Sequence, residues 1–325
     1  MKKVLLITLV LLLAAGMVFA GGSKEKGEGG DKADGGKQFL VIKSSSIGGS
    51  WYACGAAYAK LITDHTNYIA MNSASPGLTN ETIKRMAEGK AHIGLADGTA
   101  TLAAYLGKDP WDSKQDVRAM FGIWPGIINC IVNADSNIKS LADLKGKSIA
   151  TYVEGEPGGE AYIDMLSWMG INKDNSKIYR IMKNDATRMF IDGQADCLIY
   201  AFGHGHAKLK EMTSARKIRF VHVAPDIEKR FMEKYPEFAV EEFGSEFGVP
   251  DEKQFVSYYF LICMNSMPED QVYELVKVWW ENRDFLEQTL PSNIPYVNWK
   301  DPKFGVPIPL HAGAEKYFKE KGIIK

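Results

Sequence analysis

The sequence predicts an α/β fold organised as two lobes with a cleft between them. Short apolar runs alternate with helical segments, a pattern typical of βαβ units around a parallel sheet covered on both faces. The length of 325 residues suggests about two domains. The motif Gly89-x-Ala91 recurs as Gly193-x-Ala195, each time between a helix end and an apolar strand. Such a junction is common in α/β proteins, so the repeat indicates either duplicated lobes or coincidence.

The apolar runs predict strands, and segments with apolar residues three or four apart predict helices. The expected strands are residues 39–42, 68–71, 92–96, 117–123, 127–132, 148–153, 177–182, 197–200, 218–224 and 257–264. The expected helices are residues 51–65, 81–88, 99–106, 160–169, 186–191, 268–288 and 312–321. Pro268 stands at the start of the longest helix, where its missing amide hydrogen is tolerated.

The first 37 residues have the composition of an export signal followed by a tether. Two lysines precede an apolar run at residues 4–15, and small residues lead up to Ala20, which predicts a signal peptide cleaved after Ala20. The run is shorter than the ~20 residues that a membrane span needs. Gly21 and not Cys follows the cleavage site, so no lipid anchor is indicated. Residues 21–37 are rich in glycine and predict a flexible linker, so we expect a periplasmic protein.

Charge and motif content exclude several functions. The 39 basic and 40 acidic residues give no cationic surplus for a nucleic-acid binder. No nucleotide-binding glycine motif and no catalytic signature is present, so we expect neither a cofactor nor an enzyme. His204 and His206 lack a third ligand, which argues against a metal site. The four cysteines are widely spaced, without a C-x-x-C pair, and we expect them to be buried and unpaired.

Four junctions where a strand leads into a helix can carry ligand contacts. Their glycines allow a ligand to approach the backbone, and helix N-termini suit a carboxylate. These residues can also have purely structural roles. Ser50 and Asp97 would then be N-caps only, and Glu160 would only interact favourably with a helix dipole. The three glutamates of residues 154–160 would oppose an anion. The candidate ligand-binding residues are Ser46, Gly48, Gly49, Ser50, Trp51, Tyr52, Asp97, Thr99, Trp124, Gly158, Gly159, Glu160, Tyr200, Phe202 and Gly203.

Six sequence segments resemble the TAXI family, the extracytoplasmic receptors of TRAP (tripartite ATP-independent periplasmic) transporters. The resemblance covers residues 38–325 and is carried by their order along the chain. The segments are Ser46-x-Gly48-Gly49-Ser50-Trp51-Tyr52-x-x-Gly55 with Asn80 further on, Gly89-x-Ala91-x-Ile93-Gly94, Leu141-x-Asp143-Leu144-x-Gly146-Lys147, Gly193-x-Ala195-Asp196, Pro268-Glu269-Asp270-x-Val272-Tyr273 and Leu310-His311-x-Gly313-Ala314-Glu315.

The resemblance implies a two-lobed type II periplasmic-binding-protein fold that closes on a small solute and delivers it to an integral-membrane TRAP permease. The implied solutes are amino acids and organic acids, such as glutamate or a dicarboxylate. Lobe one is expected at residues 38–123 and 257–325, and lobe two at 124–256. Two loops depart from the family pattern, at residues 96–99 and 156–160. A receptor of an ABC importer and, further away, a secreted enzyme are the alternatives.

Within this scheme, the candidate residues divide into three roles. Residues of the first loop hold an acidic group from lobe one: Ser46, Gly49, Ser50 and Tyr52. Residues of the second half complete the cage from lobe two: Gly158, Gly159, Tyr200 and Gly203. The aromatic side chains of Trp51, Trp124 and Phe202 are candidate apolar walls. The two chain crossings near residues 122–125 and 254–257 are the expected hinge.

Overall fold

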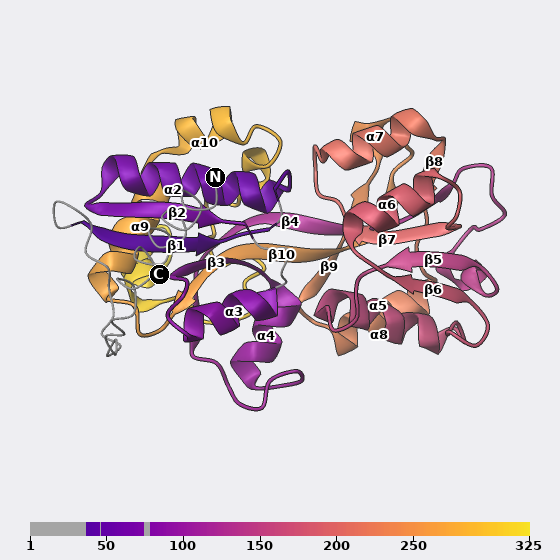
Figure 1. Cartoon of the computed structure of the whole chain (residues 1–325), viewed down its shortest axis with the longest axis horizontal. Helices are drawn as coiled ribbons and strands as arrows, with labels where there is room; N and C mark the ends of the chain where they lie inside the picture. Colours follow the sequence, from indigo (N-terminus) through magenta and orange to yellow (C-terminus); the bar gives the residue numbers. More distant parts are fainter. Residues whose placement is uncertain (1–36, 46, 75–78) are drawn as a thin grey trace, which may run out of the picture.

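The computed structural model describes residues 37–45, 47–74 and 79–325. The signal peptide, all but the last residue of the linker, and Ser46 lie outside the described residues, so those predictions are not addressed by the structure. Two α/β lobes lie side by side, joined by the long strands β4 and β10 (Figure 1). None of the helices in the described ranges has the length and apolar character needed to cross a membrane.

Lobe one is built on a β-α-β-α-β unit near the start of the chain. Its three strands are parallel, in the order β2-β1-β3. The elements are β1 (Gln38–Lys43), α2 (Ser50–His65), β2 (Tyr68–Ser73), α3 (Thr79–Ala87), β3 (Ile93–Asp97) and α4 (Gly98–Leu106). Gly94 lets α3 pack closely on β3, because a Cβ there would lie 2.5 Å from the Thr82 methyl carbon. The chain later returns to this lobe with α9 (Glu269–Glu281), α10 (Arg283–Thr289) and α11 (Ala312–Glu320).

Lobe two repeats the same unit, with parallel strands in the order β6-β5-β7. The elements are β5 (Ser148–Thr151), α5 (Pro157–Trp168), β6 (Lys177–Arg180), α6 (Lys183–Ile191), β7 (Cys197–Ala201), α7 (Ala207–Ala215), β8 (Ile218–Phe220), α8 (Pro225–Lys234) and β9 (Phe238–Phe243). Gly89 and Gly193, which end the helices before β3 and β7, both have positive φ angles, of 70° and 74°. The recurring motif therefore marks the same backbone turn in both lobes.

Two long strands, β4 (Val117–Asn133) and β10 (Glu252–Met264), run from one lobe into the other and unite the two sheets. Both are antiparallel to their neighbours, so the prediction of an all-parallel sheet is wrong for the centre of the molecule. Residues 117–123 and 127–132 form this one strand and not two. Pro125 does not interrupt β4, although its register with β10 shifts nearby, between Tyr258 and Phe260.

Other expected elements differ in extent. The helix expected at residues 268–288 divides into α9 and α10 at Asn282, which has φ −116° and ψ 39°. The strand expected at 218–224 ends at Phe220. Helices α7 and α8 and strand β9 are further elements that were not predicted from the sequence; they are short, of nine, ten and six residues.

Two separate hydrophobic cores occupy the two lobes. The core of lobe one gathers around Trp279, whose ring centroid lies 5.3 Å from those of Tyr58 and Phe121. The core of lobe two gathers around Phe231, which packs against the rings of Tyr162 and Phe255. Along β4 and β10 the chain passes from one core to the other within residues 124–127 and 256–260. All four cysteines are buried free thiols within these cores.

Candidate ligand site between the lobes

Loops from both lobes meet where the parallel strands end. In lobe one these are the loops after β1 and β3, and in lobe two the loops after β5, β6 and β7. Helix α4 contacts α5 across the interface between the lobes. Gly203, after β7, lies beside β4, since a Cβ there would be 3.3 Å from the Pro125 carbonyl oxygen. The carboxyl ends of parallel strands are the usual place for ligands in such sheets, so this interface is the candidate site.

The first loop of lobe one turns at Gly48, which has φ +88°, and Gly49 is the N-cap of α2. The alternative prediction that Ser50 is the N-cap is therefore wrong, because Ser50 is the first helical residue. As a glycine, the N-cap itself supplies no side-chain cap to this helix. The Trp51 ring meets the Tyr259 ring edge-on at 4.8 Å, which connects the loop to the centre of the sheet. The carbonyl of Tyr52 accepts a hydrogen bond from the Asn72 amide at 3.0 Å.

The second loop of lobe one presents Asp97. Its carboxylate is the N-cap of α4, accepting the Ala100 amide at 2.9 Å, and it also accepts the Thr79 hydroxyl at 2.5 Å. The capping role expected as the alternative is thus present. Burial raises the pKa of this carboxyl above its usual value, against the opposing effect of these hydrogen bonds. Thr99, in the first turn of α4, is buried.

In lobe two, Glu156 is the N-cap of α5, the helix that contacts α4, whose own N-cap is Asp97. Burial raises the pKa of Glu156 to about 8, and the negative charges of Asp97 and Glu160 add to this while Lys183 opposes it. The Oε2 atom of Glu156 is buried and has no hydrogen-bond partner among the described residues. A buried carboxylate oxygen without a partner is costly, which makes Glu156 a candidate ligand contact.

Aromatic side chains surround these carboxyls. The Tyr152 and Tyr200 rings stack at 4.2 Å, and the Tyr200 hydroxyl donates to the Ile181 carbonyl at 2.9 Å. Burial and then the charges of Asp97 and Glu156 raise the pKa of Tyr259. Asp97 is also the cross-strand partner of Tyr259, so this ring belongs to the lobe-one side of the site and is affected by the charge of Glu156 from lobe two.

Lys183 is the cation whose charge acts on Glu156. Its ammonium donates to the Ala201 carbonyl at 2.7 Å and lies 5.7 and 5.4 Å from the ring centroids of Tyr200 and Phe202. Burial lowers the pKa of Lys183 to about 8, and the charge of Glu156 opposes that shift. Burial, followed by the charge of Lys183 and then of Lys208, lowers the pKa of His206 to about 3, so His206 is neutral at pH 7.

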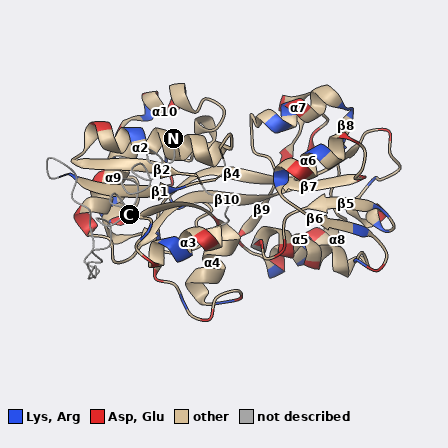
Figure 2. Ribbon diagram, viewed as in Figure 1, with Lys and Arg blue, Asp and Glu red and all other residues tan. Residues whose placement is uncertain are grey.

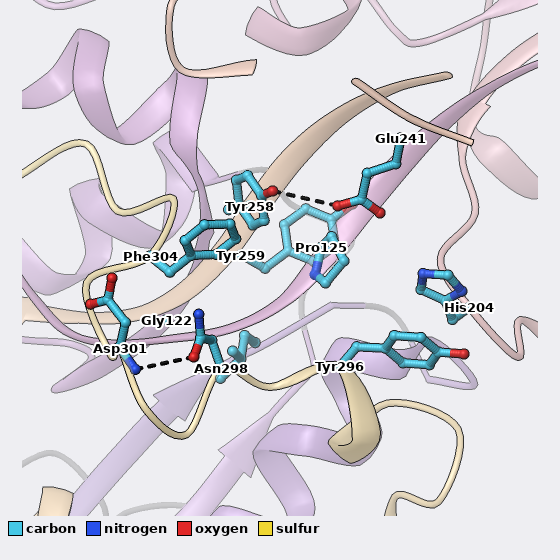
Figure 3. A pocket seen from close by; sticks show the side chains of 11 residues that line it. Gly122, Pro125, His204, Glu241, Tyr258, Tyr259, Tyr296, Asn298, Asp301 and Phe304 are labelled. Atoms are coloured by element: carbon cyan, nitrogen blue, oxygen red, sulfur yellow. Dashed lines mark hydrogen bonds between the residues drawn. The ribbon is translucent and has the colours of Figure 1, made fainter. Parts of the chain in front are cut away.

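Beside this polar group lies a cavity of about 220 Å³ (Figure 3). Its wall combines residues of the crossing strands, of lobe two and of the C-terminal segment of lobe one. The His204 ring from lobe two stacks on the Tyr296 ring at 3.6 Å, and its Nδ1 lies 3.1 Å from Glu246. The lining residues are Gly122, Ile123, Pro125, His204, Glu241, Tyr258, Tyr259, Tyr296, Asn298, Asp301 and Phe304.

Several candidate residues have other contacts. Trp124 is buried in the core of lobe one and Phe202 in the core of lobe two. Gly159 accommodates the Tyr152 side chain, since a Cβ would collide with it, while a Cβ at Gly158 would meet nothing. Glu160 accepts the Arg180 guanidinium at 2.6 Å and the Gly155 amide at 2.8 Å.

Sequence reasoning missed Lys183, Tyr259 and the C-terminal wall of the cavity. Lys183 begins the helix after β6, and the rule that ligands bind at the carboxyl ends of strands could have identified it. Tyr259 lies inside β10 and its sequence position gives no such signal. Tyr296 and Phe304 belong to a proline-rich segment far from the other loops in sequence.

The distribution of charged residues and of possible metal ligands gives no sign of a further site in the described residues (Figure 2). Figure 2 shows basic and acidic residues distributed over the helices of both lobes. Within residues 37–45, 47–74 and 79–325, no three His, Cys, Asp or Glu side chains are grouped so that they could hold a metal ion.

Comparison with known proteins places the fold. A model of the NMT1-like family matches residues 42–322. Among solved structures, the periplasmic binding protein BugD aligns with a TM-score of 0.55 and 13% identity over 88% of this chain and 98% of its own. A TctC solute-binding protein from Polaromonas, without ligand, aligns with a TM-score of 0.50 and 15% identity over 88% and 97%. The two-lobed periplasmic-binding-protein fold is therefore confirmed; at these identities, the likeness extends to the fold alone.

Proposed function

Because this chain belongs to the NMT1-like family, we propose that it is an exported solute-binding receptor that captures a small polar solute between its lobes. The observation that carries this proposal is that Asp97 of lobe one and Glu156 of lobe two are the N-caps of α4 and α5, two helices in contact across the interface, and that the charge of Asp97 acts on Glu156. Polar groups buried between two lobes have no role in either hydrophobic core. They are suited to a ligand that both lobes hold at once.

The mechanism that we propose is closure of a hinge around the solute. Among the strands of the described residues, β4 and β10 alone continue from one lobe into the other, and the core changes within residues 124–127 and 256–260. Bending at these four-to-five-residue segments would separate the lobes without disturbing either core. A solute that contacts both lobes stabilises the closed state by its difference in affinity for the two states.

The transporter and the solute class follow from the TAXI resemblance. We propose delivery to a TRAP permease in the membrane, with an ABC importer as the alternative, and a solute among amino acids and organic acids. On the lobe-one side, Gly49 is the N-cap of α2 and, as a glycine, contributes no side-chain cap, and Ser50 is the first helical residue. Free amides at such an end suit the carboxylate of these solutes. Pull-down of the receptor with a co-expressed TRAP or ABC permease would distinguish the two transporters.

The direct test is to identify the solute that the native receptor carries. The mature chain, purified from its periplasm without denaturation, should release a small polar compound that mass spectrometry detects after unfolding. Small-angle scattering should give a larger radius of gyration for the stripped, refolded receptor than for the same sample with the compound restored. A receptor that releases no compound, and whose radius does not change with the native extract, would contradict the proposed function.

A further inference from the structure

The carboxyls between the lobes outnumber the cations. Asp97 ends β3, Glu156 precedes α5, and Glu237 lies beside Gly98, with its Cβ 3.8 Å from where a Gly98 Cβ would be. The negative charge of Asp97 raises the pKa of Glu156 and, after burial and against its hydrogen bonds, that of Glu237. Like charges brought together by closing lobes oppose closure.

The basic side chains close to this site have other partners. Lys183 is held by the Ala201 carbonyl and two aromatic rings, and no hydrogen bond joins it to Glu156. The Arg180 guanidinium donates to Glu160 and to the carbonyls of Tyr152 and Val153, at 2.5 to 3.0 Å. Neither of these two side chains neutralises the carboxyl pair by direct contact.

Two buried side-chain oxygens near the site have no hydrogen-bond partner among the described residues. Besides Glu156 Oε2, the Ser257 hydroxyl is buried, with 5% of the residue exposed, and lacks a partner among the described residues. Ser257 and Tyr259 lie on the same face of β10, and Asp97 is the cross-strand partner of Tyr259. The Ser257 oxygen is 3.9 Å from the Cβ position of Gly98. One unpaired acceptor, the Ser257 hydroxyl, therefore lies beside the Asp97 loop, and a second, Glu156 Oε2, is at the start of the helix that contacts α4.

We propose that the solute carries a protonated amine, which binds between Asp97 and Glu156 and joins the two lobes. This inference rests on the proposed receptor function and narrows its solute class. An ammonium has three donors and no acceptor, which suits carboxylate and hydroxyl oxygens. Its positive charge favours loss of the Glu156 proton, so that the bound amine is attracted to ionised carboxylates of both lobes. The neighbouring rings of Trp51, Tyr152, Tyr200 and Tyr259 are compatible with a cation, since aromatic faces attract positive charge.

The inference changes the expectation for the ligand. The glycine-rich loops predicted capture of an acidic group, which the amides at the start of α2 can still provide. The carboxyl pair adds a second requirement that a dicarboxylate cannot meet. An amino acid satisfies both requirements, and a simple amine satisfies the second alone.

The test compares matched probes that differ in their amine, using calorimetry on the stripped mature chain at pH 7 and constant ionic strength. The pairs are L-glutamate with 2-oxoglutarate, and putrescine with succinate. We expect one or both amine-bearing probes to bind and the amine-free partners to bind at least tenfold more weakly. Binding of glutamate alone would indicate an amino acid, and binding of putrescine would indicate an amine without a carboxylate. Equal binding of an amine-free partner, or no binding of either amine, would overturn the inference.

Variants localise the contact. Glu156→Gln should weaken binding of the amine probe at least tenfold, while Glu154→Gln, an exposed residue of the same loop, should leave it unchanged. Thermal unfolding of both variants verifies that they fold. Equal affinity of Glu156→Gln and the unmodified chain would contradict the assignment. Amine-reactive labelling of the native extract separates the two proposals: a released solute without an amine overturns this inference and leaves the receptor function intact.

Discussion

The two lobes share one architecture and differ at the edge where they face each other. Each contains a β-α-β-α-β unit, and the order β2-β1-β3-β10 in lobe one mirrors β6-β5-β7-β4 in lobe two. In lobe one, Asp97 has both carboxylate oxygens in hydrogen bonds to its own lobe. In lobe two, the buried Glu156 Oε2 has no such bond. The repeated backbone supplies equivalent strand ends in both lobes. The side chains at these ends differ in their local partners: the carboxylate of lobe one is hydrogen-bonded within its lobe, while an oxygen of the lobe-two carboxyl is free to contact a ligand.

The largest expected effects separate the two cores. Trp279→Ala in lobe one and Phe231→Ala in lobe two each remove a fully buried ring. Each should lower the free energy of unfolding by about 3–5 kcal/mol. Hydrogen exchange should show the loss of protection mainly in the lobe that carries the substitution, because the cores are separate. Equal loss in both lobes for each variant would mean that they unfold as one unit.

The second-largest expected effect is a pH dependence of stability caused by Glu156, the carboxyl of lobe two whose Oε2 atom has no hydrogen bond among the described residues. The pKa of Glu156 is about 8 in the folded chain against an ordinary 4.5, so the folded state keeps a proton that the unfolded state has lost. This contribution is fully present below pH 4.5 and is lost as pH rises towards 8. Between pH 6 and 8, the ligand-free chain should lose about 2 kcal/mol of stability relative to Glu156→Gln.

Urea unfolding of both chains at each pH measures this difference. The comparison cancels the histidines, which titrate equally in both chains. Glu154→Gln is the control, and it should follow the pH dependence of the unmodified chain because Glu154 is exposed. A pH dependence that is the same in all three chains would show that Glu156 ionises normally.

The third effect tests the likeness of the lobes. Gly89→Ala and Gly193→Ala place a Cβ at φ angles of 70° and 74°. A Cβ at Gly89 would meet nothing within 4 Å, and one at Gly193 would make ordinary contact with the Arg216 guanidinium at 3.5 Å. Backbone strain alone should therefore lower stability by about 1–2 kcal/mol in each variant. Denaturant titration giving clearly unequal losses would show that the two turns are not equivalent.

The smallest effect is expected at Glu160, which has a strong local partner but an exposed side chain. Glu160→Gln removes its ion pair with Arg180, whose guanidinium keeps two backbone carbonyl acceptors. Because Glu160 is 47% exposed, the loss of stability should stay below about 1 kcal/mol. Affinity for the amine probe should change less than with Glu156→Gln, and calorimetry of both variants checks this order. A larger effect at Glu160 would shift the ligand contact to the first turn of α5.

The parts of the fold that sequence could predict are those with strong local patterns. The buried runs at β3 and β7 and the glycine-ended helices before them are recognisable because apolar spacing and a positive-φ glycine act within a few residues. The division of the long C-terminal helix at Asn282 was missed. So were the antiparallel centre of the sheet and β9, since strand direction and pairing depend on partners far along the chain.

The candidate site shows the same division. The sequence by itself determined which loops follow strands and carry glycine, among them the loop of Glu156, because strand, turn and helix signals are local. Only the tertiary structure decided that the helices headed by Asp97 and Glu156 contact each other, that Tyr259 pairs with Asp97, and that Trp124 and Phe202 belong to the cores. The physical reason is that burial and charge interactions arise between lobes whose contacting residues are dozens to hundreds of positions apart. A residue's environment there is set by the packing of the whole chain.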